Sequence, residues 1–181
     1  RSGPPSGRMP KGGFYFDLIV RQPPLDDSHL NVEDNLEDFT LLPQDDLAHF
    51  QREAERLYTQ TDKAILASFG GVDIGNVSGF PGPSLRHPKG IRSFEEWFVS
   101  VATRRDFLYE IQARQCEIAL KNLESLHQAV GNRITAVLVA GMDFGMQTGL
   151  LLSPEAYRQL YKPFHQRIND WIHRHTSWKT F

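Results

Sequence analysis

Hydrophobic positions change their spacing several times along the chain, and each change marks a predicted element. In four segments, apolar residues recur every three or four positions, the spacing of one face of an α-helix. These segments are 47–57, 93–101, 103–130 and 153–175. Runs rich in apolar or β-forming residues alternate with them and predict strands at 63–69, 134–140 and 177–181. Continuous apolar strands between helices are typical of a parallel sheet buried on both faces, so the pattern predicts an α/β fold with outer helices.

Sequence signals predict where three of these helices begin. Ser93 with Glu96, and Thr103 with Asp106, have the spacing of a capping box, in which the first side chain accepts a hydrogen bond from the backbone three residues later. Ser153 is followed by proline, which fits the first helical turn after a serine cap. We therefore expect helices to begin near 93, 103 and 153.

Two further signals concern how the helices end or bend. Gly131 predicts a stop after 103–130, since glycine adopts the left-handed conformation that closes many helices. Pro163 falls inside 153–175 and cannot donate a hydrogen bond to the carbonyl of Gln159, so we expect a kink there. The helical repeat of this segment continues through Tyr157, Leu160, Phe164, Ile168, Trp171 and His175. Between these positions, His165 and His173 are predicted to face solvent.

The first 46 residues differ from the rest of the chain. Aromatic and β-branched residues over 12–20 predict a strand or hairpin, ended by two prolines. Residues 25–46 contain many carboxylates and no lysine or arginine, which predicts a solvated loop that leads into a helix N-terminus. A cation site is the alternative. We expect one incomplete domain over 1–181, in which 47–181 forms successive strand–helix units.

Composition excludes several classes of function. A formal net charge of −2 and a pI near 6.4 give no basic field for nucleic acid. No apolar run approaches the roughly 20 residues that span a bilayer, and the first residues lack the apolar stretch of a secretory signal. We therefore expect a cytoplasmic protein that does not bind membranes.

The chain has a single cysteine, Cys116, so an intrachain disulfide is impossible. It falls inside a helical pattern and is predicted to be a small buried hydrophobe. No pair of cysteine or histidine residues has the spacing of zinc ligands, so we expect neither a metal nor another cofactor in this chain.

Polar residues follow the two best-defined strands, and ligands of parallel α/β folds bind at such carboxyl ends. Asp73 and Asn76 follow the first strand in a glycine-rich turn. They are either ligand-binding residues or plain turn residues. Asp143 follows the second strand, where a carboxylate must be solvated, paired or functional. Gln147 shares that rim. We assign Asp143 and Gln147 as candidate catalytic residues; a turn or a helix cap is the alternative for Asp143.

Three basic residues are candidates for binding an acidic substrate. They are Arg8, His87 and Lys89. Each lies in a segment rich in glycine or proline, so an exposed loop explains them equally well.

A set of motifs extends over most of the chain. It comprises 7–17, 64–71 with 87–92, 143–149, 153–157 and 162–165. The most specific part joins the acidic strand-end turn to the Ser-Pro-Glu helix start and the later Lys-Pro-Phe-His. Together these motifs resemble the uroporphyrinogen decarboxylase superfamily, in particular its decarboxylase-like branch.

The resemblance implies a (β/α)8 TIM barrel, of which this chain is a part, roughly the middle third to half. It also implies a lyase that removes carboxylates from a porphyrinogen-like substrate in tetrapyrrole biosynthesis without a cofactor, with this fragment inactive alone. Asp143 matches the turn that lines the substrate cleft in the family. The decarboxylases usually carry an aromatic/acidic-Ser-x-Ala-Gly turn there, whereas this chain has Asp-Phe-Gly-Met-Gln.

Two alternatives stay open. The parent protein is a methyltransferase of the same superfamily that works with zinc and a corrinoid, or the chain is a structural fragment without activity. The expected partners are a small-molecule substrate and either a second copy of the chain or the remaining part of the barrel.

Overall fold

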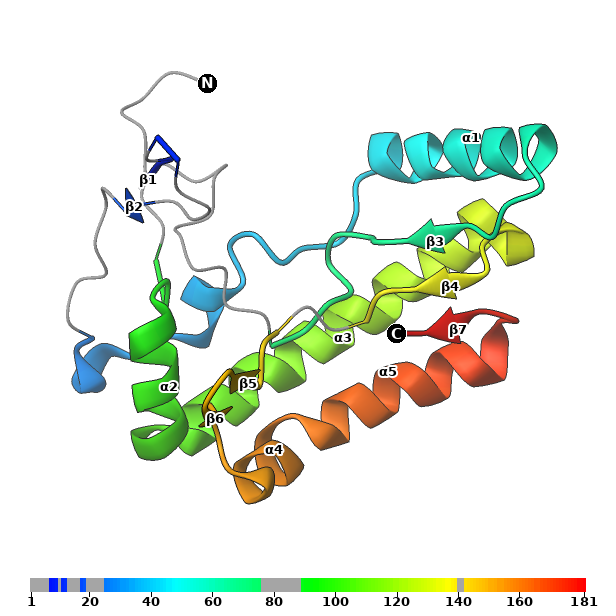
Figure 1. Cartoon of the computed structure of the whole chain (residues 1–181). Coiled ribbons are helices and arrows are strands. Elements are labelled where there is room, and N and C mark those ends of the chain that lie inside the picture. Colours follow the sequence, from blue (N-terminus) through cyan, green and yellow to red (C-terminus); the bar gives the residue numbers. More distant parts are fainter. Residues whose placement is uncertain (1–6, 10, 13–16, 19–24, 76–88, 140–141) are drawn as a thin grey trace. The chain divides into compact units, whose positions relative to one another are not determined.

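The computed structural model describes residues 7–9, 11–12, 17–18, 25–75, 89–139 and 142–181 (Figure 1). The chain divides into two compact units. Unit 1 consists of Arg1–Asp38 and Val77–Ile111, and unit 2 of Phe39–Asn76 and Gln112–Phe181. The long helix α3 (Arg105–Val130) contributes residues to both units.

Unit 1 contains a short hairpin and several helical segments. Strand β1 (Gly7–Arg8) pairs antiparallel with β2 (Asp17–Leu18). Strand β2 lies within 12–20, where a strand or hairpin was predicted, whereas its partner β1 precedes that segment. Two 3-10 helices follow, η1 (Asp27–His29) and η2 (Val32–Asn35). Helix α2 (Phe94–Thr103) buries Trp97 and Val101.

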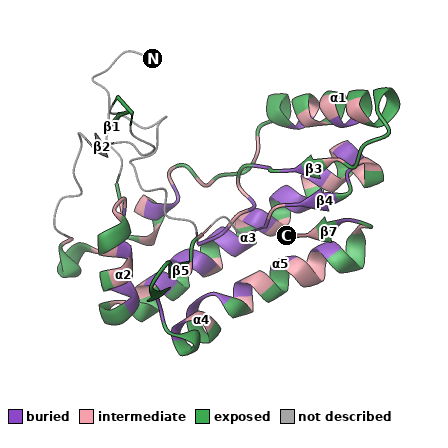
Figure 2. Ribbon diagram, in the orientation of Figure 1, coloured by how far each residue is buried: buried purple, intermediate pink, exposed green. Residues whose placement is uncertain are grey.

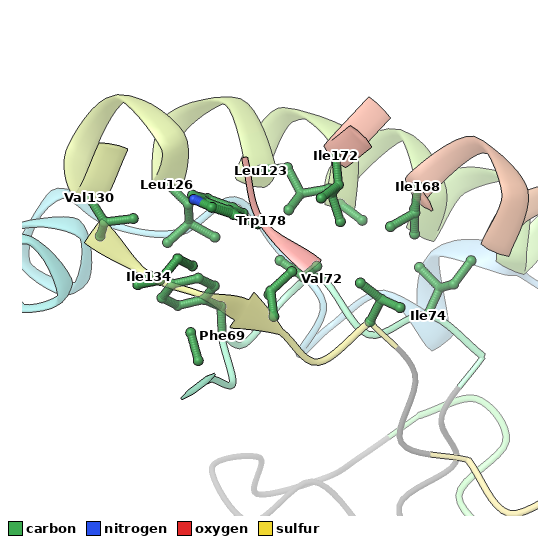
Figure 3. Packing of buried hydrophobic residues seen from close by; sticks show 14 of the residues in the cluster. Phe69, Val72, Ile74, Leu123, Leu126, Val130, Ile134, Ile168, Ile172 and Trp178 are labelled. Carbon is green, nitrogen blue, oxygen red and sulfur yellow. The ribbon is translucent and has the colours of Figure 1, made fainter. Parts of the chain in front are cut away.

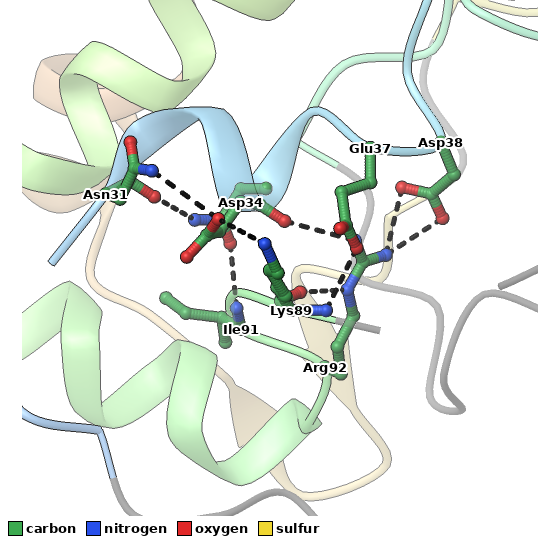
Figure 4. A network of polar contacts seen from close by, with 8 residues as sticks. Asn31, Asp34, Glu37, Asp38, Lys89, Ile91 and Arg92 are labelled. Carbon is green, nitrogen blue, oxygen red and sulfur yellow. Dashed lines mark hydrogen bonds and ion pairs between the residues drawn. The ribbon is translucent and has the colours of Figure 1, made fainter. Parts of the chain in front are cut away.

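The acidic segment of unit 1 is bound by basic residues from later in the chain, where a solvated loop was predicted (Figure 4). The Arg92 guanidinium, only 10% exposed, donates to both carboxylate oxygens of Asp38 at 2.9 and 2.8 Å. Asn35 is buried, and its Oδ1 accepts a hydrogen bond from the backbone N–H of Ile91 at 2.8 Å. The carboxylates of this segment therefore hold two distant stretches of the chain together.

A three-stranded parallel sheet forms the centre of unit 2. Its strands are β3 (Leu66–Ala67), β4 (Ala136–Val137) and β7 (Lys179–Thr180), in that order. Leu66 is opposite Ala136, which is opposite Lys179; the next residue of each strand forms a second row. The parallel pairing predicted between 63–69 and 134–140 is confirmed, as is the strand within 177–181.

Helices cover one side of this sheet. Helix α1 (Gln44–Gln60) precedes β3, α3 connects β3 to β4, and α4 (Pro154–Leu160) with α5 (Lys162–His175) connects β4 to β7. Side chains of α3 and α5 share one hydrophobic core with Phe69 and Trp178 (Figure 3). In Figure 2 the buried residues concentrate on α3 and along β3 and β4, whereas α1 buries only Leu47 and Ala54.

Most of the predicted helix signals act as expected. The side chains of Ser93 and Ser153 accept hydrogen bonds from the backbone N–H groups of Glu96 and Ala156. Gly131 has a positive φ of 57° and begins the 3-10 turn η3 (Gly131–Arg133) after α3. The helix that contains Pro163 is divided at Tyr161, so that proline stands in the first turn of α5.

Two predictions of local structure are wrong. Thr103 does not cap α3: it ends α2, and its hydroxyl donates to the carbonyl of Val99, because the chain bends one residue later at Arg104. The segment 63–69 is buried on one face only, since Leu66 and Ser68 are exposed while Ala67 and Phe69 are buried.

Candidate functional site

The carboxyl edge of the unit 2 sheet is the natural place for a binding site. Because β3 and β4 are parallel, the segments that follow them, 68–75 and 142–152, leave the sheet at the same edge. The second segment contains a tight hairpin of β5 (Gly145–Met146) and β6 (Gly149–Leu150) before α4 begins. Residues of α3 and α5 complete the surroundings of these segments.

Three of the predicted site residues lie in these two segments. Asp143 is exposed and precedes Phe144, and Gln147 is exposed in the turn between β5 and β6. Asp73 is half-buried between two fully buried residues, Val72 and Ile74. Asn76 and His87 lie outside the described residues. The structure therefore brings Asp73, Asp143 and Gln147 to one sheet edge, and their catalytic and binding roles stay predictions.

The other two predicted residues belong to unit 1. Arg8 is exposed on β1. Lys89 is exposed, its Nζ lies 3.9 Å from Oδ1 of Asp34, and its backbone N–H donates to Glu37 at 3.0 Å. Lys89 therefore contributes to the acidic-segment network, and its proposed role in binding an acidic substrate remains untested.

Four rings gather next to the carboxyl edge, one from the loop after β4 and three from the helices that follow. Phe144 stands edge-on to Tyr157 and Tyr161, with ring centroids 5.3 and 5.0 Å apart. The two tyrosine rings are nearly parallel, at 7°, with centroids 6.2 Å apart. Tyr157, Tyr161 and His165 follow one another at four-residue intervals and so share a helix face, despite the break at Tyr161.

His165 is the polar member of this ring cluster, and the prediction that it faces solvent is wrong. Its Nε2 is buried and has no hydrogen-bond partner among the described residues. Its Nδ1 lies 3.4 Å from the hydroxyl of Tyr157. Burial lowers the pKa of His165, because desolvation disfavours the imidazolium, so the ring is neutral at pH 7. His173, by contrast, is exposed as predicted.

A second buried polar group, Gln112, lies on α3. Its side chain is fully buried, and neither Oε1 nor Nε2 has a hydrogen-bond partner among the described residues. Gly75 connects it to the rings: a Cβ there would lie 3.2 Å from Oε1 of Gln112 and 3.0 Å from Cε1 of Tyr161. Gly75 also has a φ of +71°, a conformation that other residues rarely adopt. We call Gln112, Phe144, Tyr157, Tyr161 and His165 the amide–aromatic cluster.

The neighbouring polar residues of α3 have partners. Oε1 of Gln115 accepts a hydrogen bond from the backbone N–H of Gly75 at 3.2 Å. Cys116 is buried as predicted, and its burial raises the pKa of the thiol, which keeps the thiol protonated and unreactive. Gln112 is thus distinct among the buried polar side chains of this helix.

The chemistry available at this edge is that of neutral hydrogen-bonding groups surrounded by aromatic rings. Gln112 offers a donor and an acceptor, and His165 a ring nitrogen whose role depends on its tautomer. Three exposed charged residues adjoin cluster members in sequence: Asp143 precedes Phe144, Arg158 follows Tyr157 and Lys162 follows Tyr161. Among the described residues, no group of three or more histidine, cysteine, aspartate or glutamate side chains is arranged to hold a metal ion.

Sequence reasoning missed the amide–aromatic cluster, although signals for it exist. Gln112, Gln115 and Asn122 interrupt the apolar stripe of α3 at helical spacing, and amides inside an apolar stripe indicate buried polar contacts. The spacing of Tyr157, Tyr161 and His165 was also visible. No local pattern, however, shows that Gly75 and Phe144 meet these side chains, since they come from other parts of the chain.

Comparison with protein-family models, with curated proteins and with solved structures finds no match for this chain. Within the described residues, no helix combines the length and the apolar character needed to cross a membrane.

Proposed function

We propose that this chain is part of a (β/α)8 barrel enzyme similar to the uroporphyrinogen decarboxylase superfamily, and that the carboxyl edge of β3 and β4 forms part of its substrate cleft. The reaction proposed is removal of a carboxylate from a porphyrinogen-like substrate. The remaining strands would come from further parts of the protein or from a partner chain, so the described residues would hold only a part of the site.

The observation that carries the barrel proposal is the order of the strands together with the single face of the sheet that the helices cover. The strands β3, β4 and β7 are parallel and follow chain order. Ala67 and Val137, which are opposite each other, belong to the same hydrophobic core as side chains of both α3 and α5. Both connecting helices therefore cover the same face, as in a barrel, whereas a doubly wound sheet has helices on both faces.

The opposite face of the sheet also favours a barrel. Successive residues of a strand point to opposite faces, so Leu66 and Phe181, each one residue away from a core-facing position, point to the face away from the helices. They are 66% and 55% exposed. Parallel sheets occur almost only where both faces are covered. In a closed barrel these two side chains would point into the packed interior formed by the other strands.

The proposed chemistry assigns a role to Asp143. In the decarboxylation of a pyrrole acetate, the bond from the methylene carbon to the carboxylate breaks, carbon dioxide leaves, and the methylene carbon takes a proton. Positive charge builds up on the protonated pyrrole, and a fixed carboxylate near it lowers the energy of that state. The resemblance assigns that carboxylate to another residue of the family. Asp143, at the mouth of β4, is proposed to line the substrate cleft and to act on the substrate there.

The test is carbon dioxide release from uroporphyrinogen by the full-length protein, compared between wild type and Asp143→Asn. We expect the variant to fold normally, because the side chain is exposed, and to lose activity by about 100-fold, the usual effect of removing one fixed group that stabilises a transition state.

Asp62→Asn is the matched control. Asp62 is also an exposed aspartate, but it precedes β3, at the opposite edge of the sheet, where it pairs only with the exposed Lys63. We expect unchanged activity in this variant. No turnover by the wild-type protein would reject the decarboxylase, and equal loss in both variants would reject the assignment of Asp143.

A further inference from the structure

Gln112 is a buried amide whose polar atoms the described part of the fold leaves unpaired. Its carboxamide is fully buried, and both of its polar atoms lack a partner among the described residues. More than nine in ten buried polar groups in native proteins are hydrogen-bonded, so each exception has a specific reason.

We infer that the amide–aromatic cluster binds an uncharged group of a small molecule that offers both a hydrogen-bond donor and an acceptor. Gln112 would pair with that group, and the rings of Phe144, Tyr157 and Tyr161 would contact its apolar part. This inference depends on the cluster alone and would stand if the parent protein were not a decarboxylase.

The first support comes from the surroundings of Gly75, the backbone position that Gln112 and Tyr161 both approach. A Cβ at Gly75 would lie 3.2 Å from Oε1 of Gln112 and 3.0 Å from Cε1 of Tyr161. The backbone N–H of Gly75 already donates to Oε1 of Gln115, so it does not pair with Gln112.

The second support is a further unsatisfied group in the same cluster. Nε2 of His165 is buried without a partner, and its ring centroid lies 6.2 Å from that of Tyr161. Tyr161, which is buried, thus has the ring of His165 near its own ring and approaches Gly75 together with Gln112. A ligand that reaches both would satisfy groups that are otherwise costly to bury.

The third support concerns the charge of the ligand group. Every member of the cluster is neutral at pH 7, including His165, whose pKa burial lowers. A carboxylate or an ammonium group placed among them would lose its hydration without gaining an ion pair. An amide, a lactam or a heteroaromatic ring with an N–H next to a carbonyl or ring nitrogen would keep its hydrogen bonds.

Three probes of one shape distinguish these cases: benzamide, benzoate and benzamidinium share a phenyl ring and differ in the charge of the attached group. Each is titrated into the protein while the side-chain NH2 signals of Gln112 and the imidazole signals of His165 are followed by NMR. We expect saturable shifts of both residues with benzamide, and binding of the two ions weaker by roughly tenfold or more.

Variants of two glutamines on α3 test whether Gln112 is responsible for the benzamide-induced shifts. Gln112→Met keeps the size of the side chain but cannot form the hydrogen bonds, so we expect it to abolish the benzamide shifts of His165. Gln128→Met is the control, because Gln128 is exposed on the same helix, and it should leave those shifts unchanged.

Two results would overturn the inference. If none of the three probes shifts the signals of Gln112 and His165, the unpaired atoms are filled by a buried water or by other residues of the chain. If benzoate binds as well as benzamide, the site takes anions and the argument from neutrality is wrong. Binding is measured without turnover, so either failure is distinct from failure of the proposed decarboxylation.

Discussion

Two buried amides on α3 lie in opposite situations. Asn122 is 1% exposed, and both of its polar atoms are paired: Oδ1 accepts from the backbone N–H of Leu42 at 2.9 Å, and Nδ2 donates to the carbonyls of Thr40 and Gly71 at 3.0 and 2.8 Å. Gln112 is equally buried and has no partner among the described residues. The same chemical group therefore stabilises the fold at one position and stands unused by it at the other.

Only one of these two amides connects parts of unit 2. Asn122 joins α3 to the segment before α1 and to the turn after β3, which are about 80 and 50 residues away in sequence. Gln112, in contrast, approaches Gly75, a glycine with a positive φ, without bonding to it. A buried group that the fold leaves unpaired is costly to stability, which indicates a role other than stability.

The largest expected effect comes from replacing Asn122, the buried amide whose polar atoms are both hydrogen-bonded. Asn122→Leu keeps a similar size but leaves two carbonyls and one N–H without a partner, so we expect the free energy of unfolding to fall by about 3 kcal/mol or more. Urea denaturation of the purified protein, followed by circular dichroism, measures this change.

Gln112→Met is the matched substitution of the buried amide that has no hydrogen-bond partner among the described residues. It removes a buried amide that bonds nothing in the fold, so we expect a change within about 1 kcal/mol, in the stabilising direction. A loss as large as that of Asn122→Leu would mean that Gln112 has a structural partner and that the contrast between the two amides is false.

An effect between those of the two amide variants is expected at Gly75, the glycine that Gln112 and Tyr161 approach. Gly75→Ala forces a positive φ on a residue with a Cβ and brings that Cβ within 3.0 Å of Tyr161, so we expect a loss of about 1 to 3 kcal/mol. Gly70→Ala is the control, since nothing lies within 4 Å of its added Cβ, and its effect should stay within about 0.5 kcal/mol. Equal stabilities of the two variants in urea would show that Gly75 is not held against the cluster.

The smallest effect concerns pH and His165. Its pKa in the folded state is lowered by burial, so below the ordinary value of about 6.5 the unfolded chain binds more protons than the folded protein. Stability should therefore fall as the pH decreases from 7 toward 5, and His165→Asn should reduce the slope of the unfolding free energy against pH.

His173→Asn is the control for this measurement, because His173 is exposed on the same helix. Its unfolding free energy should follow the wild-type slope. An unchanged slope in His165→Asn, measured by urea unfolding across that pH range, would contradict the burial of His165.

The elements of unit 2 could be predicted because their signals are local. The serines that cap α2 and α4 and the glycine that ends α3 act through their own backbone neighbours, as does the proline at the start of α5. The apolar runs that predicted β3 and β4 also predicted parallel pairing, since helices between strands make that pairing the simplest one.

The wrong predictions have one physical cause. The burial of a residue depends on which distant segments of the chain pack against it. Leu66 stands in an apolar run and is exposed, since the described helices cover only the other face of β3. His165 stands between Phe164 and Gln166 and is partly buried, because Phe144 from the loop after β4 packs against its ring. Arg92 gave no local signal that its partners were some 55 residues away.

The amide–aromatic cluster was not predicted from the sequence, and the roles of Asp73, Asp143 and Gln147 stay predictions. Parallel strands bring their carboxyl ends to one edge, so the segments that contain these three residues leave the sheet there. The buried amide and the rings beside it come from α3, α4 and α5, whose inward residues were taken as ordinary core. Helical spacing shows that a residue faces inward, but it does not show which group it will meet.

The sequence alone determined the kind and order of the elements and the edge at which polar residues gather, because backbone propensities, caps and apolar periodicity act within a few residues. The tertiary structure decided which buried polar groups are hydrogen-bonded, which face of the sheet is covered and which histidine is removed from solvent. Those outcomes follow from contacts between segments that lie tens of residues apart, and no short stretch of the chain contains them.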